Sequence, residues 1–203
     1  MSKDAALGIK GIALGIVALF VAMLSFGSYQ IIEPGTRGIK VTLGNVDPSQ
    51  YAEGLHLKMP FITSFVVVPV KQLTAEIGAS CFSSDLQTVD AKLKILYRIP
   101  EQSVVTIYRE YSGDPMVTLI APRVLEAIKE VTATMSAEKI VKNREEVKAK
   151  SLELARKKIG TILFLEDLVI ENIDLSKELE HAIEQKMVQE QEAAKAKFTQ
   201  QQA

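Results

Sequence analysis

The side chains that could perform chemistry are few and widely spaced in this sequence. The chain has one cysteine, Cys81, and two histidines, His56 and His181. One chain therefore cannot assemble a disulfide framework or a closed tetrahedral zinc site, which takes four thiolate or imidazole ligands. His56 lies between two leucines, where packing or hydrogen bonding is the expected role rather than metal ligation. We predict no metal site and no cofactor site.

The other polar motifs do not form a recognisable catalytic set. Neither G-x-S-x-G nor H-E-x-x-H occurs in the chain, and these are the patterns of many serine and zinc hydrolases. Gly35 and Gly38 form a G-x-x-G pair that lacks the third glycine and the preceding strand of a nucleotide-binding fingerprint. Carboxylates at predicted loops or strand ends have no identifiable partner, and they are Asp85, Asp90, Glu166 and Asp167. We predict no enzymatic activity. The competing hypothesis is a membrane-tethered hydrolase.

The composition favours one globular domain with additional segments. The 203 residues are 47% hydrophobic and 24% charged, and 24 basic and 25 acidic side chains give a formal net charge of −1. Nucleic-acid-binding domains usually carry a clustered basic surplus. We therefore expect no nucleic-acid partner.

Residues 11–32 form a charge-free and mostly aliphatic stretch. As a helix this stretch would span ~33 Å, about the thickness of a bilayer core. We predict an uncleaved transmembrane anchor at 11–32 after a short tail at 1–10, because the apolar run exceeds that of a signal peptide. Gly11, Gly15, Ala18 and Ala22 recur every three or four residues, a spacing that lets helices pack closely in lipid. Alternatively, these small residues reflect only the ordinary composition of membrane helices.

Alternating segments predict strands in the rest of the chain. Ile39, Val41 and Leu43 form one apolar face ahead of a turn at Gly44, and residues 93–99 alternate in the same way ahead of Pro100. The apolar run 65–70 predicts a buried core strand or a patch at the membrane surface, with a proline that favours an edge or a strand end. The run 162–175 predicts a closing strand. The glycines at 35, 38, 44 and 54 are expected at turns.

Two helical patterns follow. Asp114 and Pro115 begin the first, whose apolar positions are Val117, Ile120, Ala121, Val124, Ile128 and Val131. The second runs from Ser136 to near Gly160, with Ile140, Val147 and Leu154 on a narrow apolar line and eight basic residues against four acidic ones. A solvated face would explain this basic excess. The alternative is a docking surface for an acidic neighbour or for anionic lipid headgroups.

The C-terminal segment 176–203 predicts a helix that cannot bury itself. Ser176 can cap it, and it carries few large apolar residues among Glu, Gln, Lys and Ala. It is either a solvent-bridging rod or the opening of a coiled coil. The predicted fold class is α+β: a single N-terminal transmembrane helix, one domain at 33–175 and this C-terminal helix.

A succession of motifs behind the predicted anchor carries a family resemblance. The motifs are 33–39 (EPGTRGI), Gly44, 54–61 (GLHLKMPF), Asp85 with Val89, 143–145 (NRE), 173–176 (IDLS) and 182–184 (AIE) with Lys186. Their order and spacing resemble the band 7 family, also called SPFH, which includes stomatin, prohibitin, flotillin and the bacterial HflK and HflC pair. The chain looks most similar to the bacterial prohibitin-like members. The similarity runs from residue 27 to residue 203, and family members usually continue into a longer coiled coil.

The resemblance implies a membrane-anchored, non-catalytic scaffold whose copies form a ring or cage around a membrane microdomain. The alternative that it implies is a regulatory subunit that sequesters a membrane AAA+ protease of the FtsH type. The expected partners are membrane lipid, further copies in a large homo- or hetero-oligomer, and that protease. The expected location is a bacterial inner membrane, with residues 1–10 in the cytoplasm and the domain in the periplasm, or a mitochondrial inner membrane in a eukaryote.

Charge and apolar patterning predict where the copies would meet. If the helix at 136–160 packs against the helix at 176–203 of a neighbour, basic and acidic side chains can set the register. An exposed ion pair is worth only ~0.2–1 kcal/mol, whereas a fully buried apolar side chain is worth ~1.5–3 kcal/mol. Apolar residues should therefore supply most of the contact energy. The predicted contacts are Leu179, Ile183, Met187, Glu180, Glu184, Arg144 and Lys148.

Overall fold

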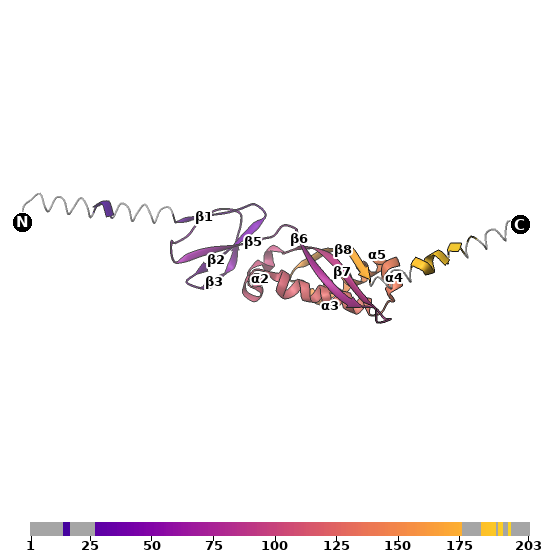
Figure 1. The fold of residues 1–203 in the computed structure, drawn as a ribbon. Helices are drawn as coiled ribbons and strands as arrows, with labels where there is room; N and C mark the ends of the chain where they lie inside the picture. The colour runs from indigo at the N-terminus through magenta and orange to yellow at the C-terminus, as the bar shows by residue number, and fades with distance from the viewer. Residues whose placement is uncertain (1–13, 17–26, 176–183, 190, 193–194, 196–203) are drawn as a thin grey trace, which may run out of the picture. The chain divides into compact units, whose positions relative to one another are not determined.

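The computed structural model describes residues 14–16, 27–175, 184–189, 191–192 and 195 (Figure 1). These residues belong to two compact units. The first unit is drawn from Met1–Lys71 and Ile99–Gly113, and the second from Gln72–Arg98 and Asp114–Ala203. Each unit combines antiparallel strands with helices, so the predicted α+β class of the domain is confirmed.

The first unit holds a two-stranded sheet and a three-stranded sheet. The small sheet pairs β1 with β4, and the larger one has the order β3-β2-β5. The elements are β1 (Tyr29–Ile32), β2 (Thr36–Thr42), β3 (Asn45–Tyr51), β4 (Gly54–Leu57), β5 (Thr63–Pro69), the 3-10 turn η1 (Glu101–Ser103) and α2 (Val104–Tyr111). All of the strand pairs are antiparallel.

Strand β1 corrects the C-terminal limit of the predicted anchor. Tyr29–Ile32 were expected to be the last residues of a membrane helix, but they pair with Gly54–Leu57 as an antiparallel strand. Absence of charge does not by itself specify a helix, and here a partner strand satisfies the backbone hydrogen bonds. The charge-free stretch ahead of β1 is therefore limited to residues 11–28.

The turn between β2 and β3 is a two-residue hairpin. Leu43 and Gly44 both have positive φ, at 49° and 82°, which matches a type I′ turn. Leu43 is 81% exposed, whereas Ile39 is fully buried. The prediction that Leu43 shares the buried face of this strand is wrong, because the turn begins one residue earlier and directs Leu43 to solvent.

The apolar run 65–70 lies largely in β5, an edge strand. Among the described strands it pairs only with β2, and Pro69 ends it as its missing N–H predicts. Val68 is buried, but Val67 is 41% exposed. The interpretation of this run as a buried core strand therefore holds for Val68 and not for the whole segment.

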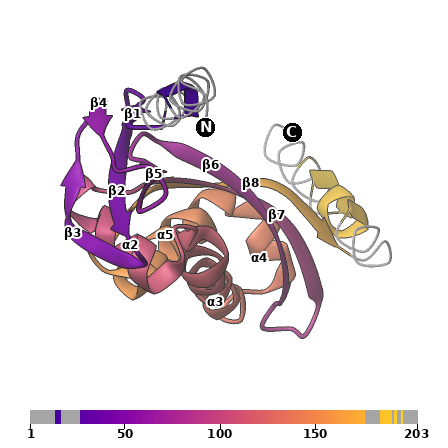
Figure 2. The same cartoon turned by 90° about the vertical axis from the view of Figure 1, so that its left-hand side faces the viewer.

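The second unit is one three-stranded sheet covered by helices. Its elements are β6 (Leu73–Phe82), β7 (Thr88–Arg98), the π turn η2 (Met116–Ile120), α3 (Ala121–Thr132), α4 (Ala137–Lys142), α5 (Arg144–Ile159) and β8 (Phe164–Leu175). The strand order is β6-β7-β8, and both pairs are antiparallel. Figure 2 shows the three helices on one face of this sheet.

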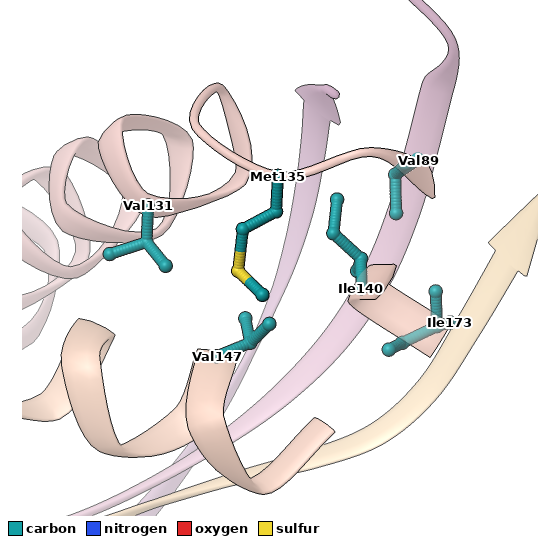
Figure 3. Packing of buried hydrophobic residues seen from close by; sticks show 6 residues of the cluster. All are labelled: Val89, Val131, Met135, Ile140, Val147 and Ile173. Carbon is teal, nitrogen blue, oxygen red and sulfur yellow. The ribbon is translucent and has the colours of Figure 1, made fainter. Parts of the chain in front are cut away.

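Strand β7 alternates between the helices and solvent as its sequence predicts. Leu93 and Ile95 are fully buried, and Lys92 and Lys94 occupy the opposite face. At one end of the helical layer, six apolar side chains from both sheet and helices pack together (Figure 3). They are Val89, Val131, Met135, Ile140, Val147 and Ile173.

The predicted first helix of this unit starts with a π turn. Asp114 accepts a hydrogen bond from the Met116 N–H (3.0 Å), so its predicted role at the helix start is confirmed. Pro122 lacks the N–H that an α-helical bond would need, and the wider i→i+5 turn precedes it. This turn shifts the helical phase. Val117 is therefore 70% exposed, and its predicted place on the buried face is wrong.

The predicted second helix is two helices. Ser136 caps α4 by accepting a hydrogen bond from the Lys139 N–H (3.4 Å), and Gly160 with φ 76° ends α5. Asn143, with φ −115° and ψ 46°, interrupts the helix between them. The predicted start at Ser136 and end near Gly160 are confirmed. The prediction of one continuous helix is wrong, because an apolar pattern does not reveal a single non-helical residue.

Asp85 has a partner that the sequence did not reveal. Its Oδ1 accepts a hydrogen bond from the Ala137 N–H (3.1 Å), so the loop between β6 and β7 is joined to the start of α4. Hydrogen bonds from Ser83 and Ala137 hold the pKa of the Asp85 carboxyl below its ordinary value. A charged carboxylate also suits a helix N-terminus. This motif residue thus serves packing within the second unit.

Ser151 offers a test of the packing of α5. It is fully buried between Val147 and Ala155 on the inner face of the helix, and its Oγ has no hydrogen-bond partner in the described chain. An unsatisfied buried hydroxyl costs ~1–3 kcal/mol. At ~2–4 °C per kcal/mol for a chain of this size, Ser151→Ala should therefore raise the melting temperature by ~2–12 °C, measured by circular dichroism. Ser151→Val, which adds volume at the same place, should lower it, and a lower value for Ser151→Ala would contradict this account.

Candidate interaction surfaces

The β1–β4 sheet exposes apolar side chains on one face. In the register of the pair, Tyr29 lies opposite Leu57 and Ile31 lies opposite Leu55. Directly opposed residues share a face of a sheet, so these four side chains form one surface. Ile31, Leu55 and Leu57 are 60%, 66% and 79% exposed. Exposed aliphatic residues that gather in this way mark interaction sites more often than single ones do.

The chain that follows β4 carries two further exposed apolar residues. The Lys58 N–H donates to the Ser28 carbonyl oxygen (2.8 Å), which continues the pairing of the two strands by one step. Met59 and Phe61 come next and are 66% and 82% exposed. We call the set Tyr29, Ile31, Leu55, Leu57, Met59 and Phe61 the β1–β4 apolar surface. This surface was not predicted from the sequence, although the alternation of 55–61 and the proximity of 29–31 to the charge-free stretch are signals of it.

The opposite face of β1 is packed against the larger sheet. Ile32 is 1% exposed, and its side chain lies against Gly38 of β2. A Cβ on Gly38 would overlap the tip of Ile32 and would also crowd Phe65. The φ of Gly38 lies outside the left-handed region, so the prediction that it serves a turn is wrong. Gly38 lies within a strand and is needed for the space that it leaves.

His56 lies on the inner face of β4 and acts as predicted. Its Nε2 is 2.7 Å from the Ala52 carbonyl oxygen. Its ring meets Tyr51 edge to face, with 5.5 Å between centroids, and lies 5.9 Å from the ring of Phe65. These contacts use the histidine for packing and hydrogen bonding within the first unit.

A hollow of about 310 Å³ in the second unit contains structural charges. Two arginines line it, together with Glu166 and Phe164. Arg98 donates to Glu166 (3.0 Å) and lies 5.1 Å from the centre of the Phe164 ring. Arg156 donates to the carbonyl oxygens of Leu165 and Glu166. Glu166 therefore has a partner, contrary to the prediction, and both guanidinium groups hold α5 or β7 to β8.

Several basic side chains of α4 and α5 are paired within the chain. Lys148 contacts Asp167 of β8 (3.1 Å), which gives that carboxylate the partner that the sequence did not reveal. Lys158 reaches Glu126 and Glu130 of α3 (2.9 and 3.1 Å). The basic excess of this segment therefore joins helices and sheet as well as facing solvent.

Arg144 is different from these lysines. It is exposed at the start of α5 and forms no ion pair with any residue that the structure describes. Of the two basic residues predicted to contact a neighbouring copy, Lys148 is thus engaged inside the chain and Arg144 keeps its charge available.

The described part of the C-terminal segment contacts α4. Residues 184–189 are helical, and Lys186 forms an ion pair with Glu138 (2.8 Å), which also binds Lys142 (2.8 Å). The two ammonium groups lower the pKa of the Glu138 carboxyl to about 2. Met187 is 40% exposed, and Glu184 is exposed beside it. Leu179, Glu180 and Ile183, the other predicted contacts in this segment, lie outside the described residues.

The predicted anchor falls mainly outside the described residues. Gly11, Ala18 and Ala22 are not among them, while Gly15 belongs to the helical residues 14–16, with open space around the position of a Cβ. Within the parts of the chain that the structure describes, no helix is both long enough and apolar enough to cross a membrane.

These features define an α+β domain with an exposed apolar surface directly after a charge-free N-terminal stretch. The family model described as "SPFH domain / Band 7 family" matches residues 30–203. The chain therefore belongs to the SPFH domain / Band 7 family, as its succession of motifs predicts.

Curated relatives with prohibitin names match most of the chain. Prohibitin-1 of Colletotrichum higginsianum is 28% identical over 189 residues, which cover 92% of this chain and 66% of that protein. Prohibitin-2 of Schizosaccharomyces pombe is 27% identical, with coverage of 92% and 64%. A mitochondrial prohibitin-7 of Arabidopsis thaliana is 30% identical, with coverage of 73% and 54%. The chain thus spans about half to two thirds of the length of these relatives.

The contact between Ile32 and Gly38 can be tested by filling the space. Gly38→Val should destabilise the first unit by ~1–3 kcal/mol, because the added methyl groups displace Ile32 from a filled site. Hydrogen exchange followed by mass spectrometry should show faster exchange of β1 and β4 amides. Gly78→Val in β6, where a Cβ meets no atom within 4 Å, is the matched control. Equal exchange in both variants would contradict the role assigned to Gly38.

Proposed function

We propose that this protein is a subunit of a membrane-anchored scaffold and that it assembles laterally with further copies. The observation that carries the proposal is the β1–β4 apolar surface. It begins at Tyr29, immediately after the charge-free stretch 11–28. A surface in this position along the chain is suited to rest in the headgroup region of the bilayer that the stretch would span.

The dimensions of the corrected stretch support this arrangement. Residues 11–28 number 18, and a helix of that length spans ~27 Å, close to the thickness of a hydrocarbon core. A span of this length leaves Tyr29 and Ile31 at the level of the interface, where aromatic rings and aliphatic side chains bind favourably. Each large side chain of the surface contributes up to ~1.5–3 kcal/mol if fully buried. Several together would hold the first unit against the membrane.

The assembly proposed is a ring or cage of copies that encloses a membrane microdomain. An anchor holds all copies in one plane and so raises their effective concentration. The exposed Met187 and Glu184 on the C-terminal helix and the available charge of Arg144 on α5 support contact between neighbours. Relatives named prohibitin are consistent with this class of protein. The scaffold that we propose has no catalytic role.

The proposed location is a single-pass position in a bacterial inner membrane, with the domain on the periplasmic side. In a eukaryote the equivalent location is the mitochondrial inner membrane. Sequestration of a membrane AAA+ protease of the FtsH type is compatible with a scaffold, and it stays a hypothesis that depends on the family resemblance.

A single tryptophan can test contact of the β1–β4 apolar surface with lipid, because the chain has no Trp of its own. In liposomes, Phe61→Trp should give blue-shifted emission that lipids brominated near the headgroup quench strongly, since the side chain enters the interface. Val117→Trp, at a 70% exposed position of η2, is the matched control and should emit as in water. Equal quenching of the two variants, or none of Phe61→Trp, would exclude the proposed contact.

Single charged substitutions can test whether the C-terminal helix forms contacts between copies. Met187→Asp and Ile183→Asp should break the assembly, because each replaces apolar contact worth ~1.5–3 kcal/mol and buries a carboxylate. Gln185→Asp adds the same charge at an exposed polar position of the same helix and should leave the assembly intact. The measurement is particle size by electron microscopy in lipid. Unchanged size in the apolar variants would move the contacts elsewhere, for example to the Gly11 and Gly15 stripe.

A further inference from the structure

Strand β6 is an open edge of the sheet in the second unit. It runs for ten residues, and each of them has a partner in β7 on one side only. In the described chain, no hydrogen bond reaches the backbone groups of β6 from the other side. A row of unpaired N–H and C=O groups is a template for another strand, and proteins usually protect such an edge.

The opposite edge of the same sheet, strand β8, is protected against pairing with a further strand. Strand β8 pairs with β7 with two irregularities, which leave Glu166 and Glu171 without a register partner. It also carries four acidic residues and no basic one. Strand β6 pairs with β7 without interruption and has Glu76 as its only charged residue. Bulges and charged side chains therefore disfavour pairing of another strand with β8, and β6 has neither feature.

We propose that β6 of a second copy pairs with this edge, antiparallel, about a two-fold axis at Gly78. Such an axis is perpendicular to the sheet and keeps the helices of both copies on one side. It therefore places outward residues opposite outward residues. The nine residues 74–82 of each copy form the new ladder, with Gly78 opposite Gly78, and the two sheets become one of six strands.

This register gives each outward side chain a suitable neighbour. The Glu76 carboxylate of one copy faces the hydroxyl of Ser80 in the other, so that no two like charges oppose each other. Thr74 faces Phe82, a pair of β-branched and aromatic side chains that is favourable across strands. Pairing of β6 with β8 of another copy would instead bring Glu76 toward an acidic strand, so the charges favour pairing of β6 with itself.

The inner face of β6 is complementary to itself in the same register. Ala75 and Ile77, toward the start of the strand, are only half-buried. Ala79 and Cys81, at the other end, are 3% and 2% exposed beneath the helices. Antiparallel pairing places the half-buried end of one copy beside the buried end of the other. In the dimer, Ala75 and Ile77 of each copy are therefore covered by the partner strand as well as by their own copy.

A position-specific disulfide tests this pairing in the full-length protein in membranes. Gly78→Cys places two thiols on the two-fold axis, with Cα atoms about 5 Å apart as in a cross-strand pair. A side chain at this position meets no atom within 4 Å, so the variant should fold. Oxidation by copper phenanthroline should convert most of it to a dimer that a reducing agent reverses on a gel.

Ser80→Cys is the matched control on the same face of the same strand. In the proposed register its two thiols lie four residues apart along the ladder, about 14 Å, which is too far for a disulfide. The parent protein should also stay monomeric on the gel, since its only thiol, Cys81, is buried. Dimer in Gly78→Cys at least tenfold above Ser80→Cys supports the proposal. Equal dimer yields in the two variants, or no dimer in a folded Gly78→Cys protein, would overturn the proposal. In either case the β6 edge would be covered by a peptide, by β8 of another copy or by nothing.

Discussion

Burial of Ile32 against Gly38 determines what the first unit presents to its surroundings. Successive side chains of a strand point to opposite faces, so a buried Ile32 forces Ile31 and Tyr29 outward. Pairing with β4 then adds Leu55 and Leu57 to the same face. The glycine makes this possible because a side chain at residue 38 would occupy the space of Ile32. One close contact thus creates an apolar surface that water does not favour and a bilayer interface does.

Charge has a mainly structural use in the second unit. Lys148, Lys158 and Arg156 of α5 each bind a carboxylate or carbonyl oxygen in β8 or α3. Half-exposed pairs of this kind contribute little to stability individually, but they fix the helix against the sheet at several points. A basic count along the sequence therefore overstates the charge that is free for a partner. Among the described residues of the predicted docking surface, Lys139, Arg144 and Lys157 are exposed and form no ion pair with another described residue.

Local signals predicted much of the fold correctly. The alternation of 93–99 specified which side of β7 is buried, and Ser136 and Gly160 marked the ends of the helical segment, because strand period and helix caps depend on neighbouring residues alone. The errors have a common origin. The strand at Tyr29–Ile32, the π turn ahead of Pro122 and the exposure of Val117 depend on hydrogen-bond partners or a helical phase that composition does not encode.

The sequence by itself determined the family, the α+β class, the strands β2, β5, β7 and β8, and the helical segments after Asp114 and Ser136. It did not reveal β1, β3, β4, β6 or α2. The family is recognised from the order and spacing of its motifs, and both are properties of the linear sequence. The tertiary structure decided the surfaces. Residues 29–31 and 55–57 become one apolar face only through pairing across more than twenty residues, and β6 is an open edge only because β7 takes the centre of the sheet. Both facts depend on which strands pair, a choice made by the packed chain and not by any local segment.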